Sequence, residues 1–103
     1  MTRQHRRFSL DEVTLQGAPV GGATIDAWED GDGTERWTAR LLVPTMDHVT
    51  DGELVGRMRD GRVIKGDVHL GDTAPGPRRT RVVLVELHGD GPLRDEAGTR
   101  LGG

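Results

Sequence analysis

Residues 54–70 read LVGRMRDGRVIKGDVHL, two short runs of alternating apolar and polar residues on either side of an Asp-Gly pair. An Asp-Gly pair in this position is a strong local signal for a β-hairpin. With a two-residue turn, Leu54 would lie opposite Asp67. With a three-residue turn over residues 59–61, in which Gly61 is left-handed and a bulge follows, the apolar residues of both strands share one face. That face comprises Leu54, Gly56, Met58, Ile64, Gly66 and Val68. We therefore predict the three-residue turn.

Alternating runs broken by glycine, aspartate or proline recur on both sides of this hairpin, which predicts an all-β chain. The first strand begins near Phe8. Phe8 and Leu10 have the opposite parity to Val13 and Leu15, so both pairs turn inward only if the strand carries a bulge between them. We predict that bulge at residues 11–12.

A second hairpin is expected from residues 23–29 and 34–43, joined by a loop in which glycines supply positive φ angles. A register that pairs Ala27 with Trp37 gathers the apolar residues of both strands on the core side. The same register turns Trp28 outward.

The most strand-like run is residues 81–88, which is apolar on both faces around VVLV and so belongs in the middle of a sheet. We expect it to pair with the second strand of the 54–70 hairpin, with Val83 opposite Val68. Residues 71–79, which contain two prolines, should form a long loop.

The sequence therefore predicts a single small barrel or sandwich of about six mostly antiparallel strands, of SH3-like, OB-like or split-barrel type. No segment has the apolar period of a substantial helix. The 103-residue chain is the size of one domain. We expect that domain to span residues 8–92, between a flexible arm at 1–7 and a flexible tail at 93–103.

Composition narrows the class of protein further. Cysteine is absent, which excludes disulfide frameworks and thiolate metal sites. No run is long and apolar enough to span a membrane, and MTRQHRR lacks the apolar run of a signal peptide, so we expect a cytoplasmic protein. Thirteen arginines against one lysine are typical of a GC-rich bacterial coding sequence.

Charge is unevenly distributed along the chain. Residues 57–81 carry a formal charge of +4, whereas the whole chain carries −3. An asymmetry of this kind favours a surface that attracts an acidic partner. The candidate partner-binding residues are Arg57, Arg59, Arg62, Lys65, Arg78 and Arg79, together with Trp28 and Arg36 of the neighbouring hairpin.

No set of residues indicates catalysis, a cofactor or a metal. The acidic stretch at residues 30–35 lacks the glycine and terminal carboxylate spacing of a calcium loop. The four histidines have no metal-ligand spacing, and we expect His69 and His88 to lie on the outer face of neighbouring strands, several residues apart along the ladder. Ser9 is the only serine, and without cysteine the usual nucleophiles are nearly missing.

These patterns predict a non-enzymatic interaction or assembly module that binds a protein partner through a sheet face or a strand edge. An open barrel has an unpaired edge strand, and pairing with a second copy of the chain would cover it. A homo-oligomer therefore agrees with the same interpretation. One alternative is single-stranded nucleic-acid binding by the basic face of the 54–70 hairpin, with a steep salt dependence. Another is a carrier or modifier that uses the terminal Gly102-Gly103, because TRLGG resembles the diglycine ends of ubiquitin-like modifiers and sulfur carriers.

Overall fold

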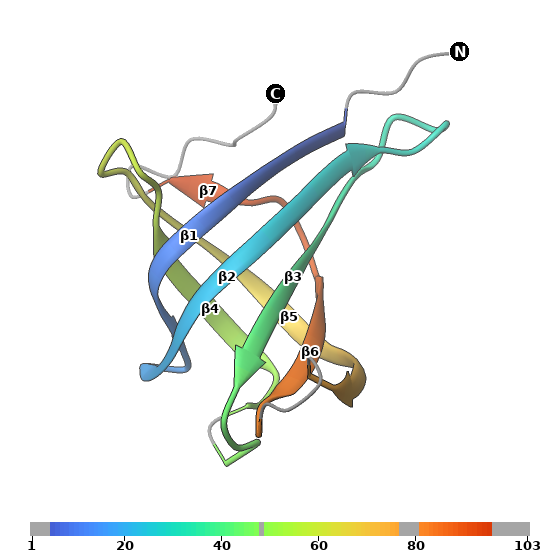
Figure 1. The fold of residues 1–103 in the computed structure, drawn as a ribbon. Coiled ribbons are helices and arrows are strands. Elements are labelled where there is room, and N and C mark those ends of the chain that lie inside the picture. Colours follow the sequence, from blue (N-terminus) through green and yellow to red (C-terminus); the bar gives the residue numbers. More distant parts are fainter. Residues whose placement is uncertain (1–4, 48, 77–80, 96–103) are drawn as a thin grey trace.

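The structure is a computed structural model that describes residues 5–47, 49–76 and 81–95. It confirms the all-β class, and the described residues contain no helix. Figure 1 shows one highly curved sheet. Its strands are β1 (His5–Leu15), β2 (Ala18–Glu29), β3 (Glu35–Val43), β4 (Gly52–Arg57), β5 (Val63–Pro75), β6 (Val83–Gly89) and β7 (Arg94–Asp95).

The six longer strands close into a ring through antiparallel pairs alone. β1, β2 and β3 form a meander, β6 and β5 follow β3 in space, and β4 joins β5 back to β1. The ring is not a regular barrel, because β4 pairs only with the Asp11–Leu15 end of β1 while His5–Leu10 pairs with β2 alone. The open barrel expected from the sequence is therefore closed along part of its length. Each of the six strands pairs on both sides over at least part of its length, and β5 also pairs with β7.

Apolar side chains fill the inside of the ring, and the largest of them is Trp37. A Cβ atom added to Gly66 would lie 2.6 Å from Trp37 Cζ2, and one added to Gly89 would lie 2.2 Å from Trp37 Cε2. The indole therefore occupies space that glycines on β5 and β6 leave free. The side chains with at most 1% exposure are Leu10, Val13, Leu15, Ile25, Ala39, Leu41, Leu54, Ile64, Val85, Leu87 and Leu93.

The hairpin of β4 and β5 has the predicted register and turn. Leu54 lies opposite Gly66, and Gly56 lies opposite Ile64. Gly61 has a φ of 93°, and its amide donates to the carbonyl of Met58 at 2.9 Å. The three-residue turn with a left-handed glycine is thus confirmed.

The predicted bulge in β1 and the predicted register of β2 against β3 are also confirmed, although β2 begins at Ala18, before the expected residue 23. The register of β1 against β2 shifts between Leu10 and Val13, and Glu12 in between has a φ of 51°. Leu10, Val13 and Leu15, on either side of this bulge, are buried, and the half-buried Phe8 also packs against the core. Ala27 lies opposite Trp37, as expected.

The predicted loop at residues 71–79 is wrong over its first part. β5 continues to Pro75, because a bulge between Leu70 and Thr73 lets the strand turn and go on pairing with β6. β6 has the central position expected of it, but Gly89 rather than Val83 lies opposite Val68. The register is therefore displaced by six residues along β6. An even displacement keeps each side chain on its predicted face.

Two boundaries of the predicted domain also move. β1 begins at His5, which pairs with Trp28, so the end of the expected arm is part of the sheet. Leu93, expected in the tail, is 1% exposed and packs beside Gly66, while β7 pairs with β5. The side chain of Leu93 packs inside the ring next to Gly66, in space that a larger residue at position 66 would restrict. The remaining arm and tail residues, 1–4 and 96–103, lie outside the described residues.

Candidate functional site

A row of polar side chains crosses the outer face of the sheet over five strands. Successive cross-strand pairs link Arg7, Asp26, Thr38, His88 and His69 on β1, β2, β3, β6 and β5. Asp26 and Thr38, in the middle of this row, are the buried polar residues of the described part of the chain. The closed sheet thus brings together groups that are far apart in the sequence.

At one end of the row, Asp26 is an ionised carboxylate held by two basic groups. Arg7 Nε donates to Asp26 Oδ1 at 2.8 Å, and His5 Nε2 lies 3.0 Å from the same oxygen. The hydrogen bond from Arg7 lowers the pKa of Asp26 below its ordinary value, against the opposing effect of burial. This end of the row is a structural ion pair whose charges compensate each other.

At the other end, two imidazoles are stacked. The rings of His69 and His88 have centroids 5.5 Å apart and planes inclined by 25°, and His69 Nδ1 contacts the carboxylate of Asp90. The sequence correctly predicts both histidines on the outer face, but it does not predict that they lie directly opposite each other. The displaced register of β6 explains the difference.

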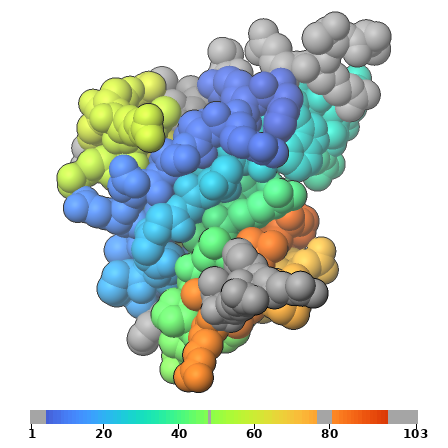
Figure 2. All heavy atoms as spheres, viewed as in Figure 1, coloured from blue at the N-terminus to red at the C-terminus, as the bar shows by residue number. Residues whose placement is uncertain are grey.

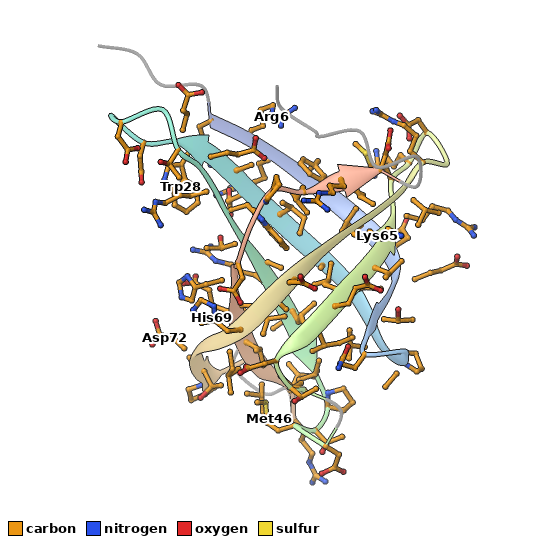
Figure 3. All side chains as sticks on the ribbon, turned by 180° about the vertical axis from the view of Figure 1, so that it is seen from behind. Arg6, Trp28, Met46, Lys65, His69 and Asp72 are labelled. Atoms are coloured by element: carbon orange, nitrogen blue, oxygen red, sulfur yellow. The ribbon has the colours of Figure 1, made fainter. Side chains whose placement is uncertain are left out.

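Next to this stack, three possible metal ligands converge. One ligand atom each from Asp72, Glu86 and His88 lie within 4.8 Å of one another. Sequence reasoning missed this group because it assigned Asp72 to a loop. The only available signal was the Glu86-x-His88 spacing, which puts two side chains on one face of a strand. Figure 3 shows His69 and Asp72 along the same side of the molecule, whereas Lys65 lies on the opposite side of the view.

An open groove runs along the outer face over β2. Its floor includes Gly22 and Thr24, and Leu42 and Leu84 line it on the side of β3 and β6. Leu42 is 50% exposed, which is high for a large apolar side chain in a strand. Figure 2 shows the face of the molecule formed by β1, β2 and β3. Most of the residues that line the groove belong to these three strands.

Three of the five predicted basic residues that the structure describes lie against carboxylates, and two of these are in the β4–β5 hairpin. Arg57 pairs with Glu12 at 3.0 Å, and Arg62 pairs with Asp60 at 2.9 Å. Arg59 is exposed at the turn. These pairs reduce the positive potential that nucleic-acid binding by this hairpin would need.

The remaining predicted site residues are scattered. Lys65 is half-buried and lines a small hollow with Glu53 and Asp67, two acidic residues. Trp28 and Arg36 lie opposite each other, and both contact the carboxylate of Asp30. Arg78 and Arg79 lie outside the described residues. Within the described part of the chain, the structure therefore does not gather the predicted residues into one site.

The fold and its outer face define a small all-β protein built from one antiparallel sheet closed into a ring. No family model, no curated protein and no solved structure matches the chain. Among the described residues, no helix has the length and apolar character needed to cross a membrane.

Proposed function

We propose that this protein is a non-enzymatic module that binds an extended segment of a protein partner along the groove over β2. The observation that carries the proposal is the exposure of Leu42 beside Leu84, above the floor at Gly22. Covering a half-exposed leucine contributes about 1 kcal/mol of binding free energy. Apolar side chains that line a hollow on a sheet face are typical of a protein interaction site.

The groove over β2 exists because of the residues that form its floor. Gly22 has no side chain at a position where β2 faces outward, and Thr24, the next outward residue, is short. The side chains of Leu42 on β3 and Ser9 on β1 rise on either side of this gap. An apolar side chain of a partner fits between them.

The rim of the groove indicates the charge of the partner. Arg7 contacts Asp26 and Arg40 contacts Glu86, yet the side chains of the two arginines remain 62% and 50% exposed. Both therefore stay accessible to a further carboxylate. The segment that fits is one with an apolar side chain next to an acidic residue.

The closed ring favours a face over an edge for this contact, because each of the six longer strands pairs on both sides over part of its length, which shortens the free edges, of which His5–Leu10 of β1 is one. The interior of the ring is packed with apolar side chains, which supports a binding role on the outside over chemistry within. A cytoplasmic location is part of the proposal, and the absence of cysteine is compatible with it.

A display library of random linear peptides, selected on the wild-type protein and counter-selected on Leu42→Asp, tests the proposal. Peptides that pair an apolar with an acidic residue should be enriched. In fluorescence anisotropy, Leu42→Asp and Arg40→Glu should each weaken their binding about tenfold or more. Leu70→Asp is the matched control, because Leu70 is 39% exposed and does not line the groove.

Two results would overturn the proposal. Enriched peptides could bind wild type and Leu42→Asp equally, which would place their site elsewhere. Alternatively, light scattering could show a wild-type dimer that Leu42→Asp converts to a monomer, and the occupant of the groove would then be a second copy of this chain. Binding of a fluorescent single-stranded oligonucleotide that Arg57→Glu with Arg59→Glu abolishes would support the nucleic-acid alternative instead.

A further inference from the structure

We propose that Asp72, Glu86 and His88 form a surface site for a divalent transition-metal cation of the zinc type. The three ligand atoms lie within 4.8 Å of one another. Two ligands on one zinc ion, each about 2.1 Å from it, are at most about 4.2 Å apart. Asp72 is exposed, so a small rotation of its side chain closes the remaining difference.

The backbone of β5 and β6 brings these three residues together. Glu86 and His88 are two residues apart on β6 and share its outer face. The bulge between Leu70 and Thr73 on β5 turns Asp72 toward the same face. Bulges commonly redirect a side chain in this way next to a functional site.

The imidazole of His88 is held in place by its surroundings. It lies against the backbone of Gly71, where an added Cβ would come within 2.3 Å of Nε2, and it stacks on His69. Any residue other than glycine at position 71 would displace the ring. His69 is in turn fixed by Asp90.

The carboxylate of Glu86 is oriented by a partner outside the group. Arg40 Nε donates to Oε2 of Glu86 at 3.2 Å, while Oε1 lies 3.6 Å from His88 Nε2. One oxygen is thus anchored and the other is directed at the imidazole. A carboxylate that is hydrogen-bonded from behind is a common arrangement around protein-bound metals.

The ligand types indicate the class of metal. One imidazole nitrogen with two carboxylate oxygens suits Zn²⁺ and similar first-row cations, whereas Mg²⁺ and Ca²⁺ prefer oxygen ligands alone. A cation here would also compensate two neighbouring negative charges. Three protein ligands leave a fourth tetrahedral position for water. This inference does not rest on the proposed partner groove, although Arg40 lines that groove and also contacts Glu86.

Isothermal titration calorimetry of the full chain without an affinity tag, titrated with ZnCl₂ alone, tests the site. We expect one saturable binding event per chain. Asp72→Asn and Glu86→Gln, which preserve side-chain shape, should each weaken it about tenfold or more. Asp67→Asn, which removes one negative charge from an exposed position of β5 outside the group, should change the affinity less than twofold.

Nuclear magnetic resonance of the imidazole nitrogens locates the metal independently of its affinity. The His88 ring nitrogens should shift on addition of Zn²⁺, and Leu42→Asp should leave this shift unchanged because Leu42 belongs to the partner groove. The proposal is overturned if wild type shows no saturable heat, if the triad variants bind as tightly as wild type, or if Mg²⁺ binds as tightly as Zn²⁺.

Discussion

Trp37 Nε1 donates a hydrogen bond to the carbonyl oxygen of Gly91 across 2.6 Å, which ties β3 to the connection between β6 and β7. Those two residues are separated by 54 positions in the sequence. The indole reaches this carbonyl because Gly66 and Gly89 have no side chains in its way. The hydrogen bond therefore satisfies the one polar atom of an indole that otherwise packs in the apolar core.

The first prediction concerns the space around the indole. Gly89→Ala places a Cβ atom 2.2 Å from two indole atoms and should lower the free energy of unfolding by about 1 to 3 kcal/mol. Urea denaturation followed by tryptophan fluorescence measures this loss. Gly22→Ala is the matched control in a strand, because its nearest neighbour would be the Leu10 carbonyl at 3.3 Å. Equal stabilities for the two variants would contradict the packing described for Trp37.

A second prediction concerns the turn between β4 and β5. Gly61 has a φ of 93° and free space around it, so a substitution there acts through the backbone alone. Gly61→Val should cost about 1 to 2 kcal/mol, and Gly61→Asn should cost less because asparagine tolerates this conformation. Thermal melting of both variants checks the order. An unchanged melting temperature for Gly61→Val would reject the three-residue turn.

The third prediction is a dependence of stability on pH. The pKa of Asp26 is lowered from 3.8 in the folded state, so its ionised form stabilises the fold above pH 3.8. This contribution is lost as the pH falls below 3.8 and through the folded-state pKa. At pH 7, Asp26→Asn should cost about 1 to 2 kcal/mol, since a buried charge-assisted hydrogen bond is weakened.

Urea denaturation of wild type and Asp26→Asn at pH 7 and at pH 2.5 measures that dependence. The difference in unfolding free energy between the two proteins should shrink at the lower pH. Asp67→Asn serves as the control, because Asp67 is exposed and its effect should stay within about 0.5 kcal/mol. A difference for Asp26→Asn that is equal at both pH values would show that its charge does not stabilise the fold.

The fourth prediction separates binding from folding at the groove over β2. Leu42 is half exposed and packs on the outside of β3, so Leu42→Asp should change the free energy of unfolding by less than about 0.5 kcal/mol. Urea denaturation measures the change. A loss of several kcal/mol would mean that Leu42 is needed for the fold, and peptide binding by this variant would then not report on the groove.

The extent to which sequence reasoning succeeded depends on how local each contact is. The β4–β5 hairpin and the pairing of Ala27 with Trp37 follow from a short turn and the parity of flanking apolar residues. The β5–β6 pairing was wrong because the connecting segment is long, and several even registers bury the same face equally well. The convergence of Asp72, Glu86 and His88 depends on that register, so the proposed metal site could not be predicted from the sequence.

By itself, the sequence determined the all-β class, the turn at Gly61, the bulge at Glu12 and the inward face of nearly every strand. The physical reason is that side chains alternate along a strand and that few residues adopt a positive φ, so both signals are contained in a few neighbouring residues. Only the tertiary structure decided the closure of the ring, the meeting of His69 with His88 and the groove beside Leu42. These features depend on which distant strands pair and in which register, and that choice is made by packing the whole core around Trp37.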